Sequence, residues 1–452
     1  MNSQDSSQRG SWGSKIAFIL AASGSAIGLG NIWRFPMEVS KNGGAVFVLI
    51  YVLAVALIGF PVMLAEVTIG RHTQKNPVGA FKHLKPNGPW KLIGYLGIIT
   101  GIFILSFYSV VAGWAASYLV KTASGAFRGD LTKQISDSLF TEFTSNPSQV
   151  LLFFIVVLGI TTFIVSKGIK GGIEKWTKVL MPLLFILLIF LAVRAITLPG
   201  ASEGISYYLK PDFSKLNSTV ILFAVGQAFF SLSLGMGTMI TYGSYISKSD
   251  NLVSDAGWVS FSDTLIAIFA GLIIFPTLFA FQGSPGEVQG EGLVFQVFPL
   301  IFAKIPGGYI FGVLFFTLLL VAAITSTISL LEVPVAYLID ERRWSRKKAA
   351  MLMGLCAFIL GIPSALSTGA VKFFTEIGFL GKMNFYFGNI ALAAGALLIC
   401  IFLAYVWRVK NALKEIAIGC SRFRLKPLWA FSMMFLSPIA IIIILYFIKT
   451  IR

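Results

Sequence analysis

The stretch GSAIGLGN, residues 24–31, interrupts the first long apolar run of the chain with three glycines, a serine and an asparagine. A second stretch, SLSLGMG, residues 231–237, interrupts the sixth apolar run in a similar way. Small residues in membrane helices often serve close helix packing. Here the two stretches lie five runs apart, as an inverted repeat of five would place them, and such paired interruptions are the best sequence indicator of a transport site. We therefore predict two helices that unwind near the middle of a membrane.

An unwound segment inside a bilayer has a direct chemical consequence. It frees backbone carbonyls and amides, which are costly in lipid and must therefore face protein, ions or a cavity. Free carbonyl oxygens can coordinate a small cation such as Na⁺, and free amides at the start of the following half-helix attract a carboxylate. One such segment can hold an amino acid and a cation together.

The composition around these stretches is that of a polytopic membrane protein. Of the 452 residues, 56% are hydrophobic and 12% are charged, and the mean hydropathy is +0.83. Soluble proteins have roughly 45–50% apolar and 25% charged residues, so a soluble enzyme, a disordered chain and a coiled coil are excluded. The net charge of +17 is assigned to basic loops near lipid headgroups rather than to nucleic-acid binding. Eleven apolar runs are expected to span the bilayer, near 13–37, 45–70, 90–120, 150–166, 175–198, 217–245, 256–282, 306–338, 349–367, 384–407 and 427–448.

The positions of the basic residues predict the orientation of the chain. Most of the 36 Lys and Arg residues fall on the side of the spans that includes the N-terminus, in segments such as 71–91, 342–348 and 408–426. Cytoplasmic loops carry such an excess, so we expect a cytoplasmic N-terminus and, with an odd number of spans, an extracellular C-terminus. Eleven spans and a short N-terminus are typical of a bacterial inner-membrane protein. The two histidines and three cysteines show no catalytic or metal-binding spacing, so no enzyme is expected.

Three motifs carry a resemblance to a known family. They are Arg9-x-x-Trp12, the segment Gly24 to Pro36 and the segment Gly226 to Tyr245. With these motifs the chain resembles the neurotransmitter:sodium symporter family over its first ten spans. Within that family it is most similar to bacterial eleven-span members that carry hydrophobic and aromatic amino acids.

The resemblance implies the architecture of a single transmembrane domain. The expected fold is all-α, with eleven helices in the leucine-transporter fold and a 5+5 inverted repeat. Repeat one would cover about 12–198, repeat two about 217–407, and an extra helix about 427–448. The first and sixth helices would be the unwound ones, a geometry known for this family.

The resemblance also implies two sodium sites. The first would use the carbonyl of Ala26, the amide oxygen of Asn31, Ser231 and Asp263, together with the carboxylate of the substrate. The second would use the backbone carbonyls of Gly24, Ile27 and Ala322. It would also use the hydroxyls of Thr325 and Ser326. Without the resemblance, Thr325 and Ser326 would be read as hydroxyls bonded to their own helix.

Asp263 departs from the family pattern. Many members have Asn at this position and bind chloride close by, or carry a Glu one turn later, where this chain has Ala267. A carboxylate inside a membrane costs several kcal/mol and is a functional hypothesis by default. We interpret Asp263 as the negative charge that chloride supplies elsewhere, which predicts chloride-independent transport. The alignment also allows a shift by one residue that makes Ser262 the ligand, and a helix-end aspartate facing a loop is a further alternative.

The implied substrate pocket is apolar apart from the groups that would hold an amino acid's carboxylate and amine. The carboxylate would meet the amides of Leu29 and Gly30 and the hydroxyl of Tyr108. The amine would meet the carbonyls of Ala26, Phe230 and Ser231 and the hydroxyl of Ser233. The side chain would contact Ile104, Tyr108, Phe230, Met236, Ser326, Thr327 and Leu330. Met236 stands where a leucine-specific relative has Phe, and because Met adapts to its neighbours we expect a broad range including Trp, Phe, Tyr, Leu and Val.

Gates are implied on both sides of this pocket. Outside, the family pairs the residue matching Arg34 with an acidic residue of span 10. In this chain that position is Asn384, so Arg34 would either form a neutral hydrogen bond with Asn384 or bind a different acceptor. Phe230 and Tyr108 would form an aromatic lid. Inside, Arg9 and Trp12 match an N-terminal latch, with Asp340 as its acidic partner and Lys15 or Glu341 as further members.

Two further features concern the helices beside the unwound segments. Gly172 and Pro182 in span 5 weaken the helix and predict a kink. The resemblance implies instead a partial unwinding there that releases the second sodium to the inside. It also implies that Glu66 lies behind the unwound part of span 1 and accepts hydrogen bonds from its freed amides.

The predicted function is sodium-coupled import of hydrophobic L-amino acids by alternating access, with two Na⁺ ions and no chloride. Proton coupling on the same fold would place a lysine at the second sodium site, and none lies near Thr325 or Ser326 in the sequence. An amino-acid sensor that binds without transport stays open. A channel lacks a repeated filter, and an enzyme lacks a nucleophile–base pair. The preferred amino acid, the stoichiometry, a second substrate site and the oligomeric state also stay open.

Overall fold

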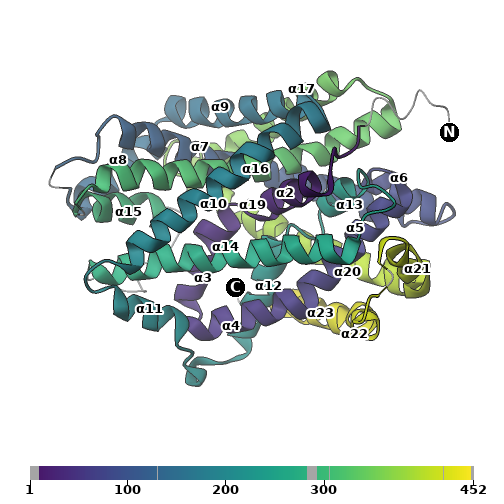
Figure 1. Cartoon of the computed structure of the whole chain (residues 1–452). Helices are drawn as coiled ribbons and strands as arrows, with labels where there is room; N and C mark the ends of the chain where they lie inside the picture. The colour runs from purple at the N-terminus through teal and green to yellow at the C-terminus, as the bar shows by residue number, and fades with distance from the viewer. Residues whose placement is uncertain (1–9, 130, 282–292, 305, 421, 449–452) are drawn as a thin grey trace.

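The computed structural model describes residues 10–448 apart from 130, 282–292, 305 and 421. In this part of the chain every regular element is a helix, as Figure 1 shows. The elements of the first half are α2 (Lys15–Ala26), η1 (Gly30–Arg34), α3 (Phe35–Lys41), α4 (Ala45–Ala54), η2 (Val55–Gly59), α5 (Phe60–Thr73), α6 (Pro77–Leu84), α7 (Lys91–Ala123), α8 (Lys133–Ser145), α9 (Pro147–Ser166), η3 (Ile169–Glu174) and α10 (Lys175–Ile196).

The second half repeats this pattern of long helices and short connections. Its elements are α11 (Ala201–Leu209), η4 (Phe213–Lys215), α12 (Ser218–Ser231), α13 (Thr238–Gly243), α14 (Leu252–Ala280), α15 (Leu293–Lys304), α16 (Gly308–Arg342), α17 (Arg346–Ala365), α18 (Lys372–Glu376), α19 (Phe379–Phe385), η6 (Tyr386–Ala391), α20 (Leu392–Ile401), η7 (Phe402–Arg408), α21 (Val409–Gly419), α22 (Lys426–Phe431), η8 (Ser432–Leu436) and α23 (Ser437–Ile448).

The number of membrane spans follows from the lengths of these helices. Among the described residues, nine helices are long and apolar enough to cross a membrane, and a tenth span is the pair of α2 with η1 and α3, bent by 46° at its break. The predicted sixth span consists of the two short helices α12 and α13. Within the described residues, each predicted apolar run therefore coincides with helix, and the total of eleven spans stays a prediction.

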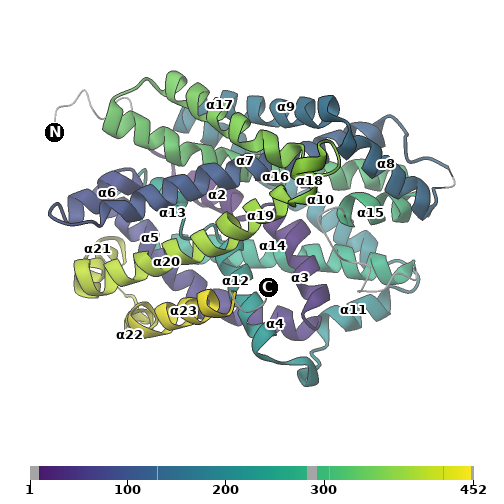
Figure 2. The same cartoon turned by 180° about the vertical axis from the view of Figure 1, so that it is seen from behind.

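The broken helices lie inside the bundle rather than at its edge. α2 packs against α10, α14 and α16, and α16 packs against α7. Figures 1 and 2 show α2 among these helices from opposite sides. The freed backbone groups of the breaks are therefore enclosed by protein, as unsatisfied polar groups inside a membrane require.

The break between α12 and α13 has a clear cause in its sequence. Gly235 and Gly237 have φ angles of 83° and 77°, which lie in the left-handed region that glycine adopts most easily. A side chain on Gly235 would also collide with the backbone of α20, because the Leu392 carbonyl occupies that position. Ser233 adopts a φ of 55° although it is not glycine, and its hydroxyl donates to the Ser25 carbonyl at 3.0 Å. This bond joins the two broken helices.

The predicted weak point in span 5 has a π-helical turn rather than a gap. Gly172 lies in η3, and Pro182 lies inside α10. A side chain on Gly172 would meet the Ile164 carbonyl near the end of α9, so the glycine permits the close approach of η3 to that carbonyl. Glu174 in the same turn accepts a hydrogen bond from the Gly13 amide at 2.8 Å, which ties this segment to the start of α2.

Candidate functional site

A small cavity of about 30 Å³ lies where the two helix breaks meet α7 and α16. Backbone from α2 and from the α12–α13 break forms one side, and side chains from α7, α16 and α20 form the rest. Its lining residues are Ser25, Ala26, Gly28, Gly30, Ile104, Tyr108, Phe230, Ser233, Met236, Ser326, Leu330 and Leu392.

Most of the residues predicted for a substrate pocket line this cavity. They are Ala26, Gly30, Ile104, Tyr108, Phe230, Ser233, Met236, Ser326 and Leu330. Sequence reasoning missed Leu392, which comes from a helix far along the chain and carries no motif. No charged side chain is among the lining residues, so the cavity suits a neutral side chain.

The predicted position of Thr327 on the cavity wall is wrong. Its hydroxyl lies 2.7 Å from the Thr161 hydroxyl of α9, on another side of α16. Successive residues of a helix point about 100° apart, and here Ser326 lines the cavity while Thr327 joins α16 to α9.

The unwound part of α2 presents its backbone toward Tyr108. The Leu29 amide donates to the Tyr108 hydroxyl at 2.7 Å. Gly28 lies so close to the hydroxyls of Tyr108 and Ser326 that a methyl group in place of its hydrogen would overlap both. The amide and the hydroxyl predicted to bind a carboxylate are thus brought together at one end of the cavity.

Next to the cavity, Asp263 is fully buried in a cluster of hydrogen-bond donors. The Asn31 amide nitrogen donates to Asp263 Oδ1 at 2.8 Å, and the Ser231 hydroxyl donates to Oδ1 and Oδ2 at 2.9 and 2.8 Å. Asp263, and not Ser262, therefore faces Asn31 and Ser231. The three side chains predicted for the first sodium site form one oxygen-rich cluster.

Two details of this cluster differ from the prediction. The side-chain oxygen of Asn31 accepts from the Gly28 amide at 3.1 Å, and its nitrogen faces the carboxylate, because a carboxylate attracts donors. Ligation of a cation by Asn31 therefore requires its amide group to turn over. The second difference is Tyr51, whose hydroxyl donates to Asp263 Oδ2 at 3.2 Å. Tyr51 could have been noticed in the sequence, because it carries the only polar side chain within residues 45–60.

The residues predicted for the second sodium site also meet, between α2 and α16. The Ser326 hydroxyl lies 3.3 Å from the Ile27 carbonyl and 3.4 Å from the Ala322 carbonyl. The Thr325 hydroxyl lies 2.9 Å from the Ala322 carbonyl, and Gly24 faces the Thr325 side chain. Carbonyl and hydroxyl oxygens suit a small hard cation, so this donor set fits Na⁺.

On one side of the cavity, Arg34 is paired differently from the prediction. Its Nη2 donates to Asn389 Oδ1 at 2.6 Å, and its Nε lies 3.8 Å from Glu38 Oε1. Of the two possibilities left open by the sequence, Arg34 meets another acceptor, Asn389, rather than Asn384. Asn389 lies in the π-helical element η6, and Asn384 lies in the preceding α19.

The predicted aromatic lid lies between two cavities. Tyr108 and Phe230 line the cavity described above and also a smaller one with Trp33, Leu380 and Asn384. The guanidinium of Arg34 lies 4.2 Å from the centre of the Phe230 ring. The lid and the Arg34 gate are thus in direct contact.

On the other side, the N-terminal segment is held by Trp12. Its indole nitrogen donates to the Tyr242 carbonyl of α13 at 3.0 Å. Arg9 lies outside the described residues, and Asp340 accepts from the Asn76 amide at 2.8 Å. Lys15, a further possible member of this latch, pairs with Asp255 of α14 at 3.2 Å.

Glu66 supports a different break from the one expected. Its Oε1 accepts from the Gly235 amide at 2.7 Å. It therefore holds the freed backbone between α12 and α13, and the expectation that it lies behind the break in span 1 is wrong. Nothing in the sequence around Glu66 distinguishes the two breaks as its partner, so only the packing of the helices identifies the correct one.

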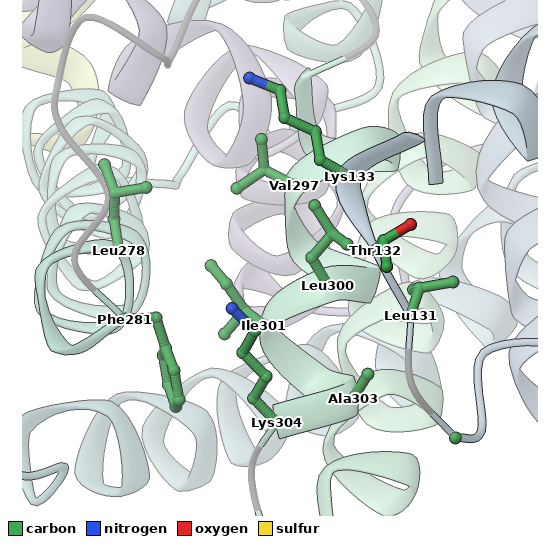
Figure 3. Close-up of a pocket in the computed structure, with 11 residues that line it drawn as sticks. Leu131, Thr132, Lys133, Leu278, Phe281, Val297, Leu300, Ile301, Ala303 and Lys304 are labelled. Atoms are coloured by element: carbon green, nitrogen blue, oxygen red, sulfur yellow. The ribbon is translucent and has the colours of Figure 1, made fainter. Parts of the chain in front are cut away.

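A larger cavity of about 640 Å³ lies elsewhere in the molecule, beside α15 and the end of α14. Figure 3 shows its apolar walls with Thr132, Lys133 and Lys304 as the polar side chains. None of the residues predicted for the substrate or for sodium is among its lining residues. It is not the site formed by the broken helices.

Comparisons with known proteins identify the family and the overall fold. The chain matches the sodium:neurotransmitter symporter family over residues 9–130 and 126–451. It is 39% identical to the uncharacterized sodium-dependent transporter YhdH of Bacillus subtilis, over 96% of both chains. It is 38% identical to an uncharacterized sodium-dependent transporter of Haemophilus influenzae, over 97% of both. The crystal structure of MhsT in complex with L-phenylalanine is similar with a TM-score of 0.89 and 44% identity, covering 97% of this chain and 99% of that one.

Proposed function

This chain belongs to the sodium:neurotransmitter symporter family, and from that premise we propose that it imports neutral hydrophobic L-amino acids together with Na⁺ and without chloride. Its family and fold make the chain a multi-pass sodium-dependent symporter with the leucine-transporter fold, not an enzyme. What we propose beyond this is the class of amino acid, the number of sodium ions, the independence from chloride and the inward direction of transport.

The observation that carries the proposal is the cavity between the two helix breaks. One end offers the Leu29 amide and the Tyr108 hydroxyl, and the wall includes Ile104, Met236 and Leu330. The Leu29 amide donates to the Tyr108 hydroxyl in this structure. An amino acid's carboxylate would fit this end by accepting from both groups, because unwound helix amides attract anions. Its side chain would lie against the apolar wall. The phenylalanine bound to the similar MhsT supports the same class of substrate.

We assign two sodium ions to the two oxygen-rich sets beside the cavity. The first would be held by Asp263, Asn31, Ser231, the Ala26 carbonyl and the substrate carboxylate. The second would be held by Gly24, Ile27, Ala322, Thr325 and Ser326. The first set touches the amino acid, so each ligand raises the affinity for the other, and this linkage couples the two fluxes.

The fixed charge of Asp263 replaces the chloride that other members of the family bind. The carboxylate is fully buried, and no cationic side chain contacts it among the described residues. A buried carboxylate without a counter-ion is costly, and a sodium ion would remove that cost. Sodium binding is thus favoured without a mobile anion.

Release toward the inside would begin at the π-helical turn of span 5. Gly172 and Pro182 both weaken regular helix there, and Glu174 ties the turn to Gly13. Opening this turn would let water reach the second sodium. With the basic loops on the same side, the N-terminus would be cytoplasmic and the C-terminus extracellular, in the inner membrane of a bacterium.

Equilibrium binding tests the proposed substrate class. Purified protein should bind radiolabelled tryptophan in NaCl and in sodium gluconate but not in KCl, and phenylalanine, tyrosine, leucine and valine should compete. Lysine and glutamate should not compete, because the wall offers them no charge. Binding that ignores Na⁺ would favour proton coupling, and competition by charged amino acids would refute the substrate class.

Met236→Phe should narrow the substrate range. A ring at this position of the wall cannot repack as the unbranched Met does. We expect affinity for tryptophan to fall by roughly tenfold while leucine changes by less than about threefold, since overpacking of this kind costs about 1–3 kcal/mol. The ratio of the two competition constants measures this, and Met236→Leu serves as the control that keeps a flexible apolar side chain. An equal change for both substrates would contradict the role of Met236.

Asn389→Ala should loosen the lid over a bound amino acid. The bond from Arg34 to Asn389 involves a charged donor, and such bonds contribute about 1.5–3 kcal/mol. We expect bound tryptophan to dissociate roughly tenfold faster in Asn389→Ala. Asn384→Ala is the matched control, and its rate should stay near that of the wild type. The reverse order of the two rates would restore Asn384 as the gate partner.

A further inference from the structure

A groove on the outer edge of the bundle, between α9 and α17, has no part in the site described above. The two helices lie side by side at one edge in both Figure 1 and Figure 2. The groove has a volume of about 410 Å³, and its walls include Ile155, Phe163, Met351 and Leu355. Phe163, Met351 and Leu355 are 55–58% exposed, so the groove opens to the outside of the protein.

The groove exists because two lining positions carry no side chain. Gly354 packs directly against Thr162 of α9, which brings the two helices together at the floor. Gly159 lies on the α9 side, and a Cβ added there would meet no atom of another part of the protein within 4 Å. Larger residues at these two positions would close the space, so its shape is set by the sequence.

One end of the groove is basic. Ser166 and Lys347 line it at the end of α9 and the start of α17. Lys167 follows directly, with its ammonium 5.0 Å from the centre of the Phe163 ring. Arg346 is neutralised by the buried Glu332, at 2.7 Å. No carboxylate lies within ion-pair distance of Lys167 or Lys347 among the residues that the structure describes, so both charges are available to a ligand.

We propose that this groove binds an anionic phospholipid of the surrounding bilayer, with an acyl chain along the apolar walls and the phosphate at Lys347 and Lys167. The apolar walls of the groove suit an acyl chain, and the two unpaired ammonium groups at its end suit a negatively charged phosphate. Basic pockets between membrane helices bind anionic headgroups for this reason. The inference needs only that the chain spans a membrane, so it stands or falls separately from the proposed substrate.

Lipid binding to the purified full chain tests this directly. Native mass spectrometry with added phosphatidylglycerol or phosphatidylcholine gives the affinity of the first bound lipid. We expect phosphatidylglycerol to bind more tightly, and Lys347→Gln and Lys167→Gln each to weaken it by roughly fivefold. Gly159→Leu should abolish the preference for phosphatidylglycerol by filling the groove, since the space at the added Cβ is open.

Lys348→Gln is the matched control. It removes the same charge from the neighbouring position, where the ammonium lies 4.4 Å from the Trp344 ring and does not line the groove. Its lipid affinity should equal that of the wild type. Equal binding of both lipids, equal loss in Lys348→Gln and Lys347→Gln, or unchanged binding in Gly159→Leu would overturn the proposal. A Gly159→Leu variant that shifts only the monomer–dimer ratio would overturn it as well, and would assign the groove to a second copy of the chain.

Discussion

Asp263→Asn should lower sodium-dependent uptake in chloride-free buffer by roughly a hundredfold or more, since removing one member of a buried charge pair costs about 3–5 kcal/mol. The substitution keeps the size of the side chain and one of its two oxygens, which can still accept from Asn31. The other oxygen becomes an NH2 group, which can donate to the Ser231 or Tyr51 hydroxyl once that hydroxyl turns. The fold is therefore expected to survive, and the main loss is the negative charge beside the first sodium. Uptake of radiolabelled tryptophan into proteoliposomes measures the effect.

Chloride should restore part of this loss. If Asp263 supplies the charge that chloride supplies in other members of the family, the Asp263→Asn protein should become dependent on chloride, while the wild type stays indifferent to it. Asp212→Asn is the control, because Asp212 is half-exposed and far from the site, where it pairs with Lys215 and caps the short helix η4 through Ser214. An Asp263→Asn protein that transports normally in gluconate would show that this charge has no part in sodium binding.

Gly28→Ala should lower the affinity for the amino acid by roughly a hundredfold. The added methyl group would overlap the hydroxyls of Tyr108 and Ser326, so both must move. Tyr108 is proposed to bind the substrate carboxylate and Ser326 the second sodium. Each hydrogen bond to a charged group contributes about 1.5–3 kcal/mol, and the loss of two such bonds gives this magnitude. Equilibrium binding of tryptophan over a range of sodium concentrations separates the two contributions.

Gly226→Ala is the matched control for this substitution. Gly226 also lies in a broken span, in α12, but a methyl group there meets no atom within 4 Å. Its binding should equal that of the wild type, and its yield of folded protein should be no lower, because alanine favours a helix over glycine. Equal and small effects of the two substitutions would remove Gly28, and with it the cavity, from the substrate site.

The fold and the position of the site could be predicted because their signals are local in the sequence. The glycine-rich stretches at 24–31 and 231–237 mark the helix breaks, and the structure gives left-handed backbone at Gly235 and Gly237. The apolar runs between them mark the long helices. Glycine-rich stretches and apolar runs are set by residues that are neighbours in the sequence. They can therefore be recognised without knowing how the helices pack.

The errors arose where a role depends on how a helix is wound or packed. Arg34 bonds to Asn389 of the π-helical η6, whereas the position matched in the sequence, Asn384, lies in the preceding α19. A rotation of one residue turns Thr327 toward α9. Tyr51 bonds to Asp263, which lies 212 residues later in the chain, and no local sequence pattern indicates this contact. These positions needed three-dimensional packing to identify.

The most direct measurement is tryptophan uptake into proteoliposomes that contain the wild-type protein. An inward Na⁺ gradient is compared with an equal K⁺ gradient, and each is run with chloride and with gluconate. We expect accumulation above equilibrium only with Na⁺, to the same extent in both anions. Accumulation that requires chloride would contradict the role of Asp263. Sodium-dependent binding without accumulation would make the protein a sensor, and the absence of any sodium effect would contradict the proposed ion sites.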